Sequence, residues 1–414
     1  MMNRRRFLTS VSTLGLTSIG LTACSYWLKP KLLNPCLSDL PEQLSNHPLI
    51  TQIWQGIDAS QVWDCHVHLI GSGDSNPSAP NAVPWFNPDM DSYRHPFLKT
   101  QKYFYLNGSC IDESAIDASY VARLQSLVAG MRPGFKAMLF AFDWHHDAQG
   151  QARPEQSIFH IPNSYAQKIA KTYPYSFEWV ASIHPYRHDC VEALQQVHAD
   201  GARAIKWLPS AMGIDPLSKQ CERFYQAAAA LQMPIISHTG EEKAVQGGNQ
   251  DFGNPLRIRR ALDAGVKVVL AHCASDGDDI DLDKGNDAER VKSFSLFARL
   301  MDESRYNSLL YADISALTLR NHAWVIPDLL QRQTWHSRLL NGSDYPLAGI
   351  LPLFNLDSFV SENLLAQEAV PVLNAIQKYN PLLFDFALKR LLRNGAAQFP
   401  VSVFETRRFF DKLS

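Results

Sequence analysis

The stretch Val62-Trp63-Asp64-Cys65-His66-Val67-His68 is the part of the chain that decides the fold. Its apolar and β-branched residues predict a strand. Side chains two residues apart leave a strand on the same face. We therefore expect Asp64, His66 and His68 to point one way, and Cys65 and Val67 to point the other way. Two imidazoles on one rigid strand can hold a divalent cation, provided that other strands supply further ligands.

Apolar segments of the same kind recur along the chain, each followed by a segment with helical spacing. The predicted strands cover 62–67, 135–142, 179–183, 202–207, 234–238, 267–272, 309–314 and 339–344. The predicted helices cover 114–129, 164–172, 191–199, 221–231, 256–264, 288–301 and 322–331. Apolar strands that alternate with helices indicate a parallel sheet buried on both faces. Eight such units predict an α/β protein with a (β/α)8 TIM barrel.

An open, doubly wound sheet is the alternative architecture, but no Gly-x-Gly-x-x-Gly turn follows an early strand. The barrel is expected to occupy residues 61–400, with a helical extension that covers it from about Pro381. Residues 24–60, rich in Pro, Leu and Ser, are interpreted as a tether followed by a docking segment. Residues 71–99 form a long Gly- and Pro-rich insertion, which either walls a pocket or is a plain surface excursion.

The first 23 residues are predicted to be an export signal, with an uncleaved amphipathic leader as the alternative. A basic start precedes a short uncharged run, 9–23, that is too short to span a membrane. Arg4 and Arg5 match the twin-arginine (Tat) pattern. Leu21-Thr22-Ala23-Cys24 resembles the lipobox of bacterial lipoproteins, in which the cysteine is acylated. The resemblance implies a lipoprotein on the periplasmic side, with Ser25 favouring the outer membrane.

Composition and cysteine content narrow the class of protein further. The 414 residues are 46% hydrophobic, with a formal net charge of -2 and no run of like charges, which gives no case for a nucleic-acid partner. The only membrane contact expected is through the lipid anchor. Cys65 and Cys273 lie in apolar strands and are expected to be buried thiols. The candidates for disulfides, whose connectivity sequence leaves open, are Cys36, Cys110, Cys190 and Cys221.

Polar residues gather at the predicted carboxyl ends of the strands, where barrels of this class carry their active sites. They are His66, His68, Asp143, His145, His146, His184, Arg187, Lys206, His238, His272, Asp313 and Asp344. Imidazoles and carboxylates that converge from separate strands suit Zn²⁺ or a similar divalent ion. The sequence therefore predicts a metal site at this end of the barrel.

Four spaced motifs resemble the amidohydrolase superfamily, in particular its amidohydrolase-2 (amidohydrolase-related) branch. They are Asp64-x-His66-x-His68, His238-Thr239-Gly240, Ala271-His272-Cys273 and Gly342-Ser343-Asp344-Tyr345-Pro346. The resemblance implies that His66, His68, His238 and Asp344 hold the metal. It also implies that His272 orients water or substrate, or binds a second metal.

Lys206 leaves two interpretations open. In binuclear members of the superfamily a lysine at the end of the fourth strand is carboxylated and bridges two metals. Otherwise Lys206 is a cation that binds a substrate carboxylate or pairs with a neighbouring acid. His145, His146, His184 and Arg187 are candidates for substrate contact, with plain surface or capping groups as the alternative for the histidines. Glu241 and Glu242 are read as solvated loop charges, with a second base as the alternative.

The activity implied is metal-dependent hydrolysis of an amide, ester, lactone or C–C bond in a small organic molecule that could bear a carboxylate. Zn²⁺ is the expected ion, one or two per chain. Ionised water would attack the substrate, with Asp344 taking and returning its proton. Non-oxidative decarboxylation is the first alternative. The second is a lipoprotein that binds a metal or ligand without turnover.

Overall fold

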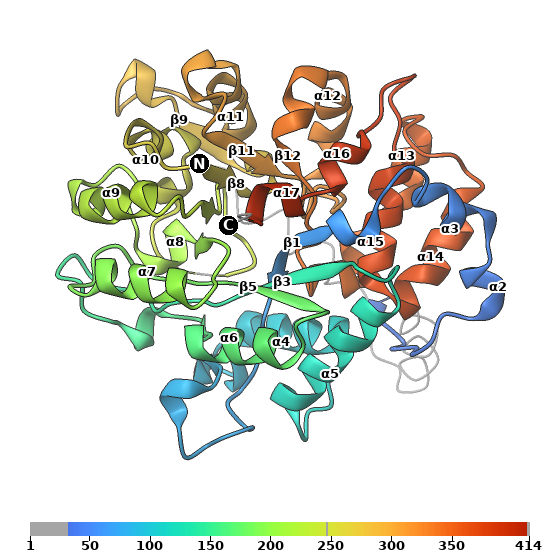
Figure 1. Ribbon diagram of the computed structural model, residues 1–414, viewed down its shortest axis with the longest axis horizontal. Helices are drawn as coiled ribbons and strands as arrows, with labels where there is room; N and C mark the ends of the chain where they lie inside the picture. Colours follow the sequence, from blue (N-terminus) through green and yellow to red (C-terminus); the bar gives the residue numbers. More distant parts are fainter. Residues whose placement is uncertain (1–31, 246, 412–414) are drawn as a thin grey trace, which may run out of the picture.

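The structure, a computed structural model, describes residues 32–245 and 247–411 (Figure 1). The predicted export signal and Cys24 lie outside the described residues. The strands that form the barrel are β1 Trp63–His68, β3 Lys136–Phe140, β5 Phe177–Val180, β6 Ile205–Trp207, β7 Ile235–Ser237, β8 Val268–Leu270, β11 Leu310–Asp313 and β12 Leu339–Leu340. Each matches one of the apolar segments chosen from the sequence.

The barrel closes by parallel pairing. One sheet has the order β1-β3-β5 and the other β12-β11-β8-β7-β6. Parallel bridges from Ala181 to Ile205 and from Val67 to Tyr345 join the two sheets at both seams. The (β/α)8 TIM barrel is confirmed.

Helices surround the strands, as Figure 1 shows. Between the strands lie α5 Ile116–Ala129, α6 Asn163–Thr172, α7 Cys190–Ala199, α8 Pro209–Met212, α9 Glu222–Ala230, α10 Arg259–Asp263, α11 Ser293–Asp302 and α12 Ile326–Gln331. The predicted helix over 288–301 was wrong at its start. There β10, Arg290–Lys292, pairs antiparallel with β9, Asp278–Ile280. Half-buried Val291 stands between exposed Arg290 and Lys292, a period of two that suits a strand.

Strand β1 departs from simple alternation. Trp63 and Cys65 pack inside the barrel with Met138 and Phe140, whereas Val67 packs against the outer layer. The register with β3 shifts between Asp64 and Val67, and such an irregularity re-aims the side chains that follow it. The expectation that Asp64 shares the face of His66 and His68, opposite Cys65, was therefore wrong.

The segments before and after the barrel pack onto it, as far as the structure describes them. Helices α2 Glu42–Ser45 and α3 Pro48–Ile53 precede β1, and Trp54 stacks on Phe386 at a centroid distance of 4.4 Å. The extension expected from Pro381 is α15, Pro381–Leu391, which follows α13 Leu356–Ser361 and α14 Ala369–Tyr379. Beyond the expected boundary at residue 400, α16 Val401–Phe404 and α17 Arg407–Phe410 continue, and Phe410 joins the cluster inside the barrel. Helices α16 and α17 close the amino end of the barrel, so a site can form only at its carboxyl end.

The insertion after β1 leads into a helix at the carboxyl end. Its β2, Trp85–Phe86, pairs antiparallel with β4, Phe159–His160, and α4, Pro96–Gly108, follows. A disulfide joins Cys36 to Cys110, whereas Cys65, Cys190, Cys221 and Cys273 are buried free thiols. The bridge fastens the segment before the barrel to the end of α4.

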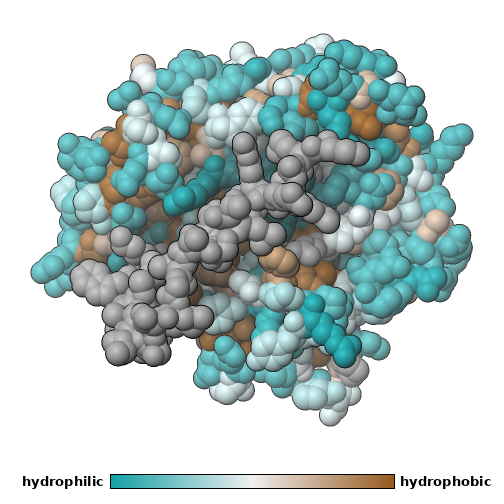
Figure 2. All heavy atoms as spheres, turned by 180° about the vertical axis from the view of Figure 1, so that it is seen from behind, coloured by the Kyte–Doolittle hydropathy of each residue, from teal (hydrophilic) through white to brown (hydrophobic). Residues whose placement is uncertain are grey.

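The face shown in Figure 2 carries mostly hydrophilic side chains, with hydrophobic areas scattered between them. Within 32–245 and 247–411, none of the helices combines the length and the apolar character needed to cross a membrane.

Candidate metal centre

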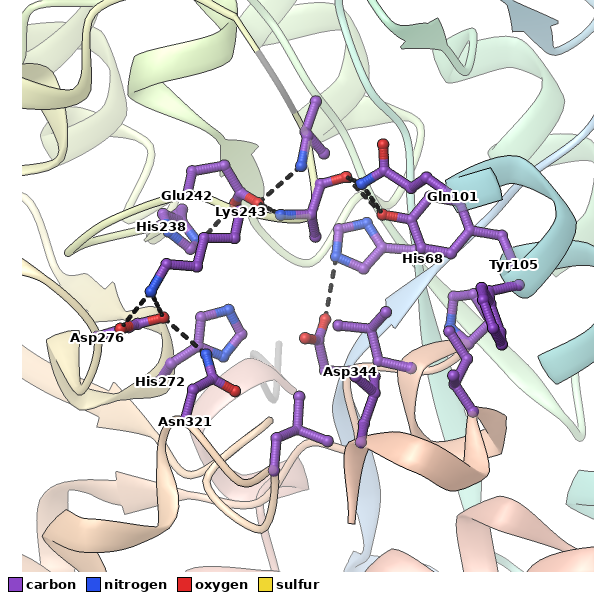
Figure 3. A pocket seen from close by; sticks show the side chains of 18 of the residues that line it. His68, Gln101, Tyr105, His238, Glu242, Lys243, His272, Asp276, Asn321 and Asp344 are labelled. Atoms are coloured by element: carbon purple, nitrogen blue, oxygen red, sulfur yellow. Dashed lines mark hydrogen bonds and ion pairs between the residues drawn. The ribbon is translucent and has the colours of Figure 1, made fainter. Parts of the chain in front are cut away.

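A cavity of about 360 Å³ lies at the carboxyl end of the barrel (Figure 3). Its polar floor comes from the ends of five strands and contains His68, Lys206, His238, His272 and Asp344. Apolar side chains from α4 and from the loop after β12 form much of its wall. The structure thus brings together groups that are as many as 276 residues apart, from His68 to Asp344.

Three ligand atoms meet at one point of this floor. His66 Nε2 lies 3.3 Å from His68 Nε2, and Asp344 Oδ1 lies 3.4 Å from the first and 3.2 Å from the second. Ligands placed about 2.0–2.1 Å from a tetrahedral ion lie about 3.4 Å from one another. The spacing of the three atoms therefore fits a single divalent cation.

His238 lines the same cavity and offers an unused nitrogen. Its Nδ1 lies 3.3 Å from Glu242 Oε2, and its buried Nε2 has no hydrogen-bond partner among the described residues. Leaving a buried polar atom unpaired costs free energy. A cation at the floor would relieve that cost, which is a second indication that these residues suit a metal. The His238 ring packs 5.2 Å from that of His272.

Asp313 at the end of β11 sets the orientation of His66. Its Oδ2 accepts a hydrogen bond from His66 Nδ1 at 2.9 Å, so Nε2 carries the lone pair that faces His68 and Asp344. Its Oδ1 accepts from the backbone N–H of His272 at 3.0 Å and from that of Ser315 at 3.1 Å. One buried carboxylate thus supports two histidines of the site.

The backbone around His272 is strained. His272, Cys273 and Ala274 have φ angles of 57°, 50° and 49°, in the left-handed region that non-glycine residues rarely adopt. His272 Nδ1 lies 3.0 Å from the carbonyl oxygen of Ser315. Since a carbonyl only accepts, Nδ1 carries a proton, and in the neutral tautomer Nε2 is then the acceptor. The strained turn holds this ring between His66 and His238.

The electrostatics favour the ligand forms of these side chains. Burial, followed by repulsion from Lys206, lowers the pKa of His66 to about 3, and burial lowers the pKa of His68 and of His238. Burial alone would raise the pKa of Asp344. Attraction to the imidazoles of His272 and His66 and the hydrogen bond with His68 instead hold it well below its ordinary value. Neutral imidazoles and an ionised carboxylate are the forms that bind metal.

Lys206 reaches the same floor from β6. Its Nζ lies 3.0 Å from His66 Nε2 and 4.8 Å from the centre of the Phe140 ring. Burial lowers its pKa to about 8, so the ammonium loses its proton more readily than an exposed lysine. In the part of the chain that is described, it forms no ion pair with a carboxylate within 4.0 Å. Lys206 thus stands beside the candidate ligands.

The residues proposed for substrate contact do not reach the cavity. His145 Nδ1 and His184 Nε2 each lie 2.9 Å from a backbone carbonyl oxygen, of Ala211 and Met212. Arg187 pairs with Asp143 at 3.0 Å and with Asp189 at 2.7 Å. His146 packs on His184 at 4.5 Å. These residues form a second group, which we call the side cluster: Asp143, His145, His146, His184 and Arg187.

Glu242 was misjudged from the sequence. It is not a solvated loop charge, because its carboxylate is buried, accepts the N–H groups of Ala244 and Val245 and faces His238. Burial raises its pKa to about 7. Its place four residues after His238 was the one available signal. Glu241 remains exposed and pairs with Lys243.

Neither a protein-family model nor a curated protein matches this sequence. Solved structures that resemble it include a 5-carboxyvanillate decarboxylase of Sphingomonas paucimobilis, at 10% identity over 84% of this chain and 98% of that one, with a TM-score of 0.47. A TIM-barrel protein of Bordetella bronchiseptica is 16% identical over 76% and 99%, with a TM-score of 0.45. A probable 2-pyrone-4,6-dicarboxylic acid hydrolase of Acinetobacter baumannii is 12% identical over 78% and 97%, with a TM-score of 0.39. Likenesses at this level assign no activity to this chain.

Proposed function

We propose that this protein is a metal-dependent hydrolase of the amidohydrolase-2 branch of the amidohydrolase superfamily. Its substrate would be a small organic molecule with an amide, ester, lactone or activated C–C bond. The observation that carries the proposal is the meeting of His66 Nε2, His68 Nε2 and Asp344 Oδ1 at the floor of a cavity. The unpartnered His238 Nε2 in that floor supports it.

His66, His68, His238 and Asp344 would hold one divalent ion, and Zn²⁺ is the first choice for a set of imidazoles and one carboxylate. When bound, such an ion supplies Lewis acidity and lowers the pKa of a coordinated water from about 16 to about 7. A second ion would require Lys206 to be carboxylated. Unmodified, Lys206 supplies a positive charge beside His66 instead.

The chain itself handles the proton. Asp344 Oδ1 faces His66 and His68, which leaves Oδ2 to accept a proton from water and return it to the leaving group. His272 is placed as an acceptor at Nε2 and would orient the same water through one of its O–H bonds. Asp313 keeps His66 Nε2 free of a proton by accepting the one on Nδ1.

The test is a metal count on the purified protein together with hydrolysis of 4-nitrophenyl esters and of γ- and δ-lactones. We expect about one divalent ion per chain, loss of turnover on chelation and recovery when Zn²⁺ is returned. Lys206→Ala is assayed alongside, since two ions that fall to one or none would establish a bridging lysine. A protein that binds no divalent ion, or that turns over equally well with chelator, contradicts the proposal.

A non-oxidative decarboxylase is the second candidate, favoured by the buried ammonium of Lys206 at the cavity floor. Such a cation can grip a substrate carboxylate beside the metal. Release of CO₂ from an aromatic carboxylic acid, with no turnover of esters or lactones, would select it. Ester or lactone turnover without CO₂ release would select the hydrolase.

We also propose that the protein is exported and anchored through an acylated Cys24 on the periplasmic side, in the outer membrane rather than the inner one. The Cys36–Cys110 disulfide supports this proposal, because such bonds persist in oxidising compartments. Radiolabelled palmitate should mark the full-length chain and not Cys24→Ala. Equal labelling of the two, or none, would contradict the anchor.

A further inference from the structure

We infer that the cavity selects uncharged substrates that carry an apolar group, and discriminates against substrates with a carboxylate remote from the reacting bond. The inference rests on the proposed function for the position of the reacting bond. It narrows a substrate class that the sequence left open.

The wall of the cavity is apolar on several sides. Above the polar floor it is lined by Phe104, Phe159, Leu208, Leu319, Ile350 and Leu353. These side chains come from α4, from β4, from the loops after β6 and β11, and from the loop after β12. A volume of about 360 Å³ is at the small end of the range for ligand sites. A substrate whose reacting carbonyl sits at the floor must therefore lay its remaining atoms along hydrocarbon.

Cations that could pair with a substrate carboxylate are few. Among the described lining residues, lysines are present only at 206 and 243, and there is no arginine. Lys206 lies at the floor against His66, where the metal would be. Lys243 Nζ already forms ion pairs with Asp276 at 2.8 Å and with Glu241 at 3.2 Å, so two carboxylates of the chain neutralise its charge. Figure 3 shows Lys243 turned toward Asp276.

Acidic groups add to the discrimination. Asp276, Glu241 and Glu242 line the same cavity, and a second carboxylate there would lose its hydration without gaining a counter-ion. The guanidinium of Arg187, a candidate for substrate contact from the sequence, instead pairs with Asp143 and with Asp189. The acidic side chains of the lining thus disfavour a substrate carboxylate that lies away from the metal.

The wall is held in place by hydrogen bonds. Gln101 Nε2 and Tyr105 Oη, both on α4, donate to the carbonyl oxygen of Ala244 in the loop after β7. Figure 3 shows the two side chains converging on this loop. The contact ties α4 to the loop that also carries Glu242 and Lys243. A fixed apolar wall discriminates by shape and by charge without having to close on its ligand.

Two non-hydrolysable ketones of equal length test binding apart from turnover. The pair is 2-octanone and 7-oxooctanoate, which differ only in a terminal methyl group or carboxylate. We expect the metal-loaded protein to bind 2-octanone at least about 10-fold more tightly in calorimetric titrations. Among neutral 2-alkanones, each added methylene should improve Kd by about 4-fold until the cavity is filled. Equal binding, or tighter binding of 7-oxooctanoate, overturns the inference.

A matched pair of esters shows whether the inference and the proposed function fail together. These are 4-nitrophenyl hexanoate and mono-4-nitrophenyl adipate, with kcat/KM expected to favour the hexanoate at least about 10-fold. If neither ester nor any lactone turns over while 2-octanone still binds selectively, the hydrolase proposal fails and the inference on the cavity stands. If both esters turn over equally, the inference fails and the hydrolase stands.

A cation placed in the wall should reverse the preference. Phe104→Arg puts a guanidinium on the cavity side of α4, and 7-oxooctanoate should then bind at least as well as 2-octanone. Phe97→Arg on the same helix is the control, since Phe97 is 76% exposed and outside the cavity lining. It should leave the ratio of the two Kd values within about 2-fold. Leu353→Arg repeats the test from another wall, should Phe104→Arg not fold, and an unchanged ratio in a folded variant contradicts the inference.

Discussion

Two groups of histidines follow the carboxyl ends of the barrel strands, and they differ in what their ring nitrogens contact. In the side cluster, His145, His146 and His184 each bond a backbone carbonyl at 2.9 Å. At the cavity floor, the Nε2 atoms of His66 and His68 face each other and a carboxylate, and that of His238 faces no polar partner among the described residues.

The carboxylates of the two groups differ in the same way. Asp143 in the side cluster is paired with Arg187 and accepts the backbone N–H of His184. Asp344 has imidazoles around it and no arginine or lysine within ion-pair distance in the described ranges. A group whose buried polar atoms all have partners stabilises the fold, whereas one with a buried, unpartnered acceptor in a cavity suits a cation. Residue type and position after a strand do not separate these two cases.

The largest expected effect comes from exchanging the two aspartates for asparagine. Asp344→Asn removes both a ligand charge and the proton acceptor, so kcat/KM for the best ester should fall by about 10³-fold or more. Asp143→Asn is the matched change in the side cluster and should leave kcat/KM within about 3-fold. Initial rates on metal-loaded, folded protein measure both. If the two variants lose activity to the same extent, the distinction between the groups is wrong.

The barrel could be predicted from sequence because its strands are buried on both faces. The runs around Leu139, Val269 and Leu310 are apolar whichever way each residue points, so their identification needs no knowledge of register. The order of the strands and the end that carries the polar residues then follow from the barrel itself.

What failed depended on local register and on contacts that form only when the loops fold. The inward turn of Cys65 comes from the shift between Asp64 and Val67, which is visible only against β3. Burial of Glu242 depends on the fold of the loop that it caps through Ala244 and Val245. Arg187 could not be separated from a substrate-binding arginine, because Asp143 and Asp189 are satisfied by it only in three dimensions.

The next effect is the pH dependence of the unfolding free energy. It should have opposite signs for Glu242, which lines the cavity, and for Asp143 in the side cluster. Burial raises the pKa of Glu242 to about 7 from 4.5. Stability from this group is complete below pH about 4.5 and is lost as pH rises through 7. In metal-free protein, the contribution of Glu242 to the unfolding free energy should fall by about 3 kcal/mol across that window. Since Asp64 and the buried histidines also change their protonation in this range, the effect is read as a difference. In urea unfolding, the unfolding free energy of the wild type should fall from pH 5 to pH 8 by most of that amount relative to that of Glu242→Gln.

Asp143 should behave in the reverse manner. Burial alone would raise the pKa of Asp143, but Arg187 and His146 hold it below its ordinary value. Its stabilisation is present above the unfolded pKa of about 4 and is lost as pH falls through the lower folded value. Asp143→Asn should therefore leave the slope between pH 5 and 8 unchanged. The same slope in Glu242→Gln as in the wild type, or an altered slope in Asp143→Asn, would contradict the assignment.

Asp313 should influence the metal without contacting it. Asp313→Asn weakens the hold on His66 Nδ1, and such supporting carboxylates typically contribute 10–100-fold to metal affinity. We expect a loss of about that size in competition with a Zn²⁺ chelator. Asp279→Asn is the control, since Asp279 is also buried and hydrogen-bonded, to Ser293 Oγ at 2.7 Å, away from the cavity. An equal loss in both variants would mean that any buried aspartate affects the site through stability.

The smallest expected effect tests the side cluster on its own. His145→Ala removes the hydrogen bond to the Ala211 carbonyl from a half-buried position, which should lower the unfolding free energy by about 1 kcal/mol. Metal content and kcat/KM should stay at the wild-type values, because His145 lies outside the cavity lining. Urea unfolding and a metal count on the same preparation measure both. Loss of metal without loss of stability would mean that His145 acts together with the histidines of the cavity floor. The contrast between histidines bonded to backbone carbonyls and histidines that face the cavity would then be wrong.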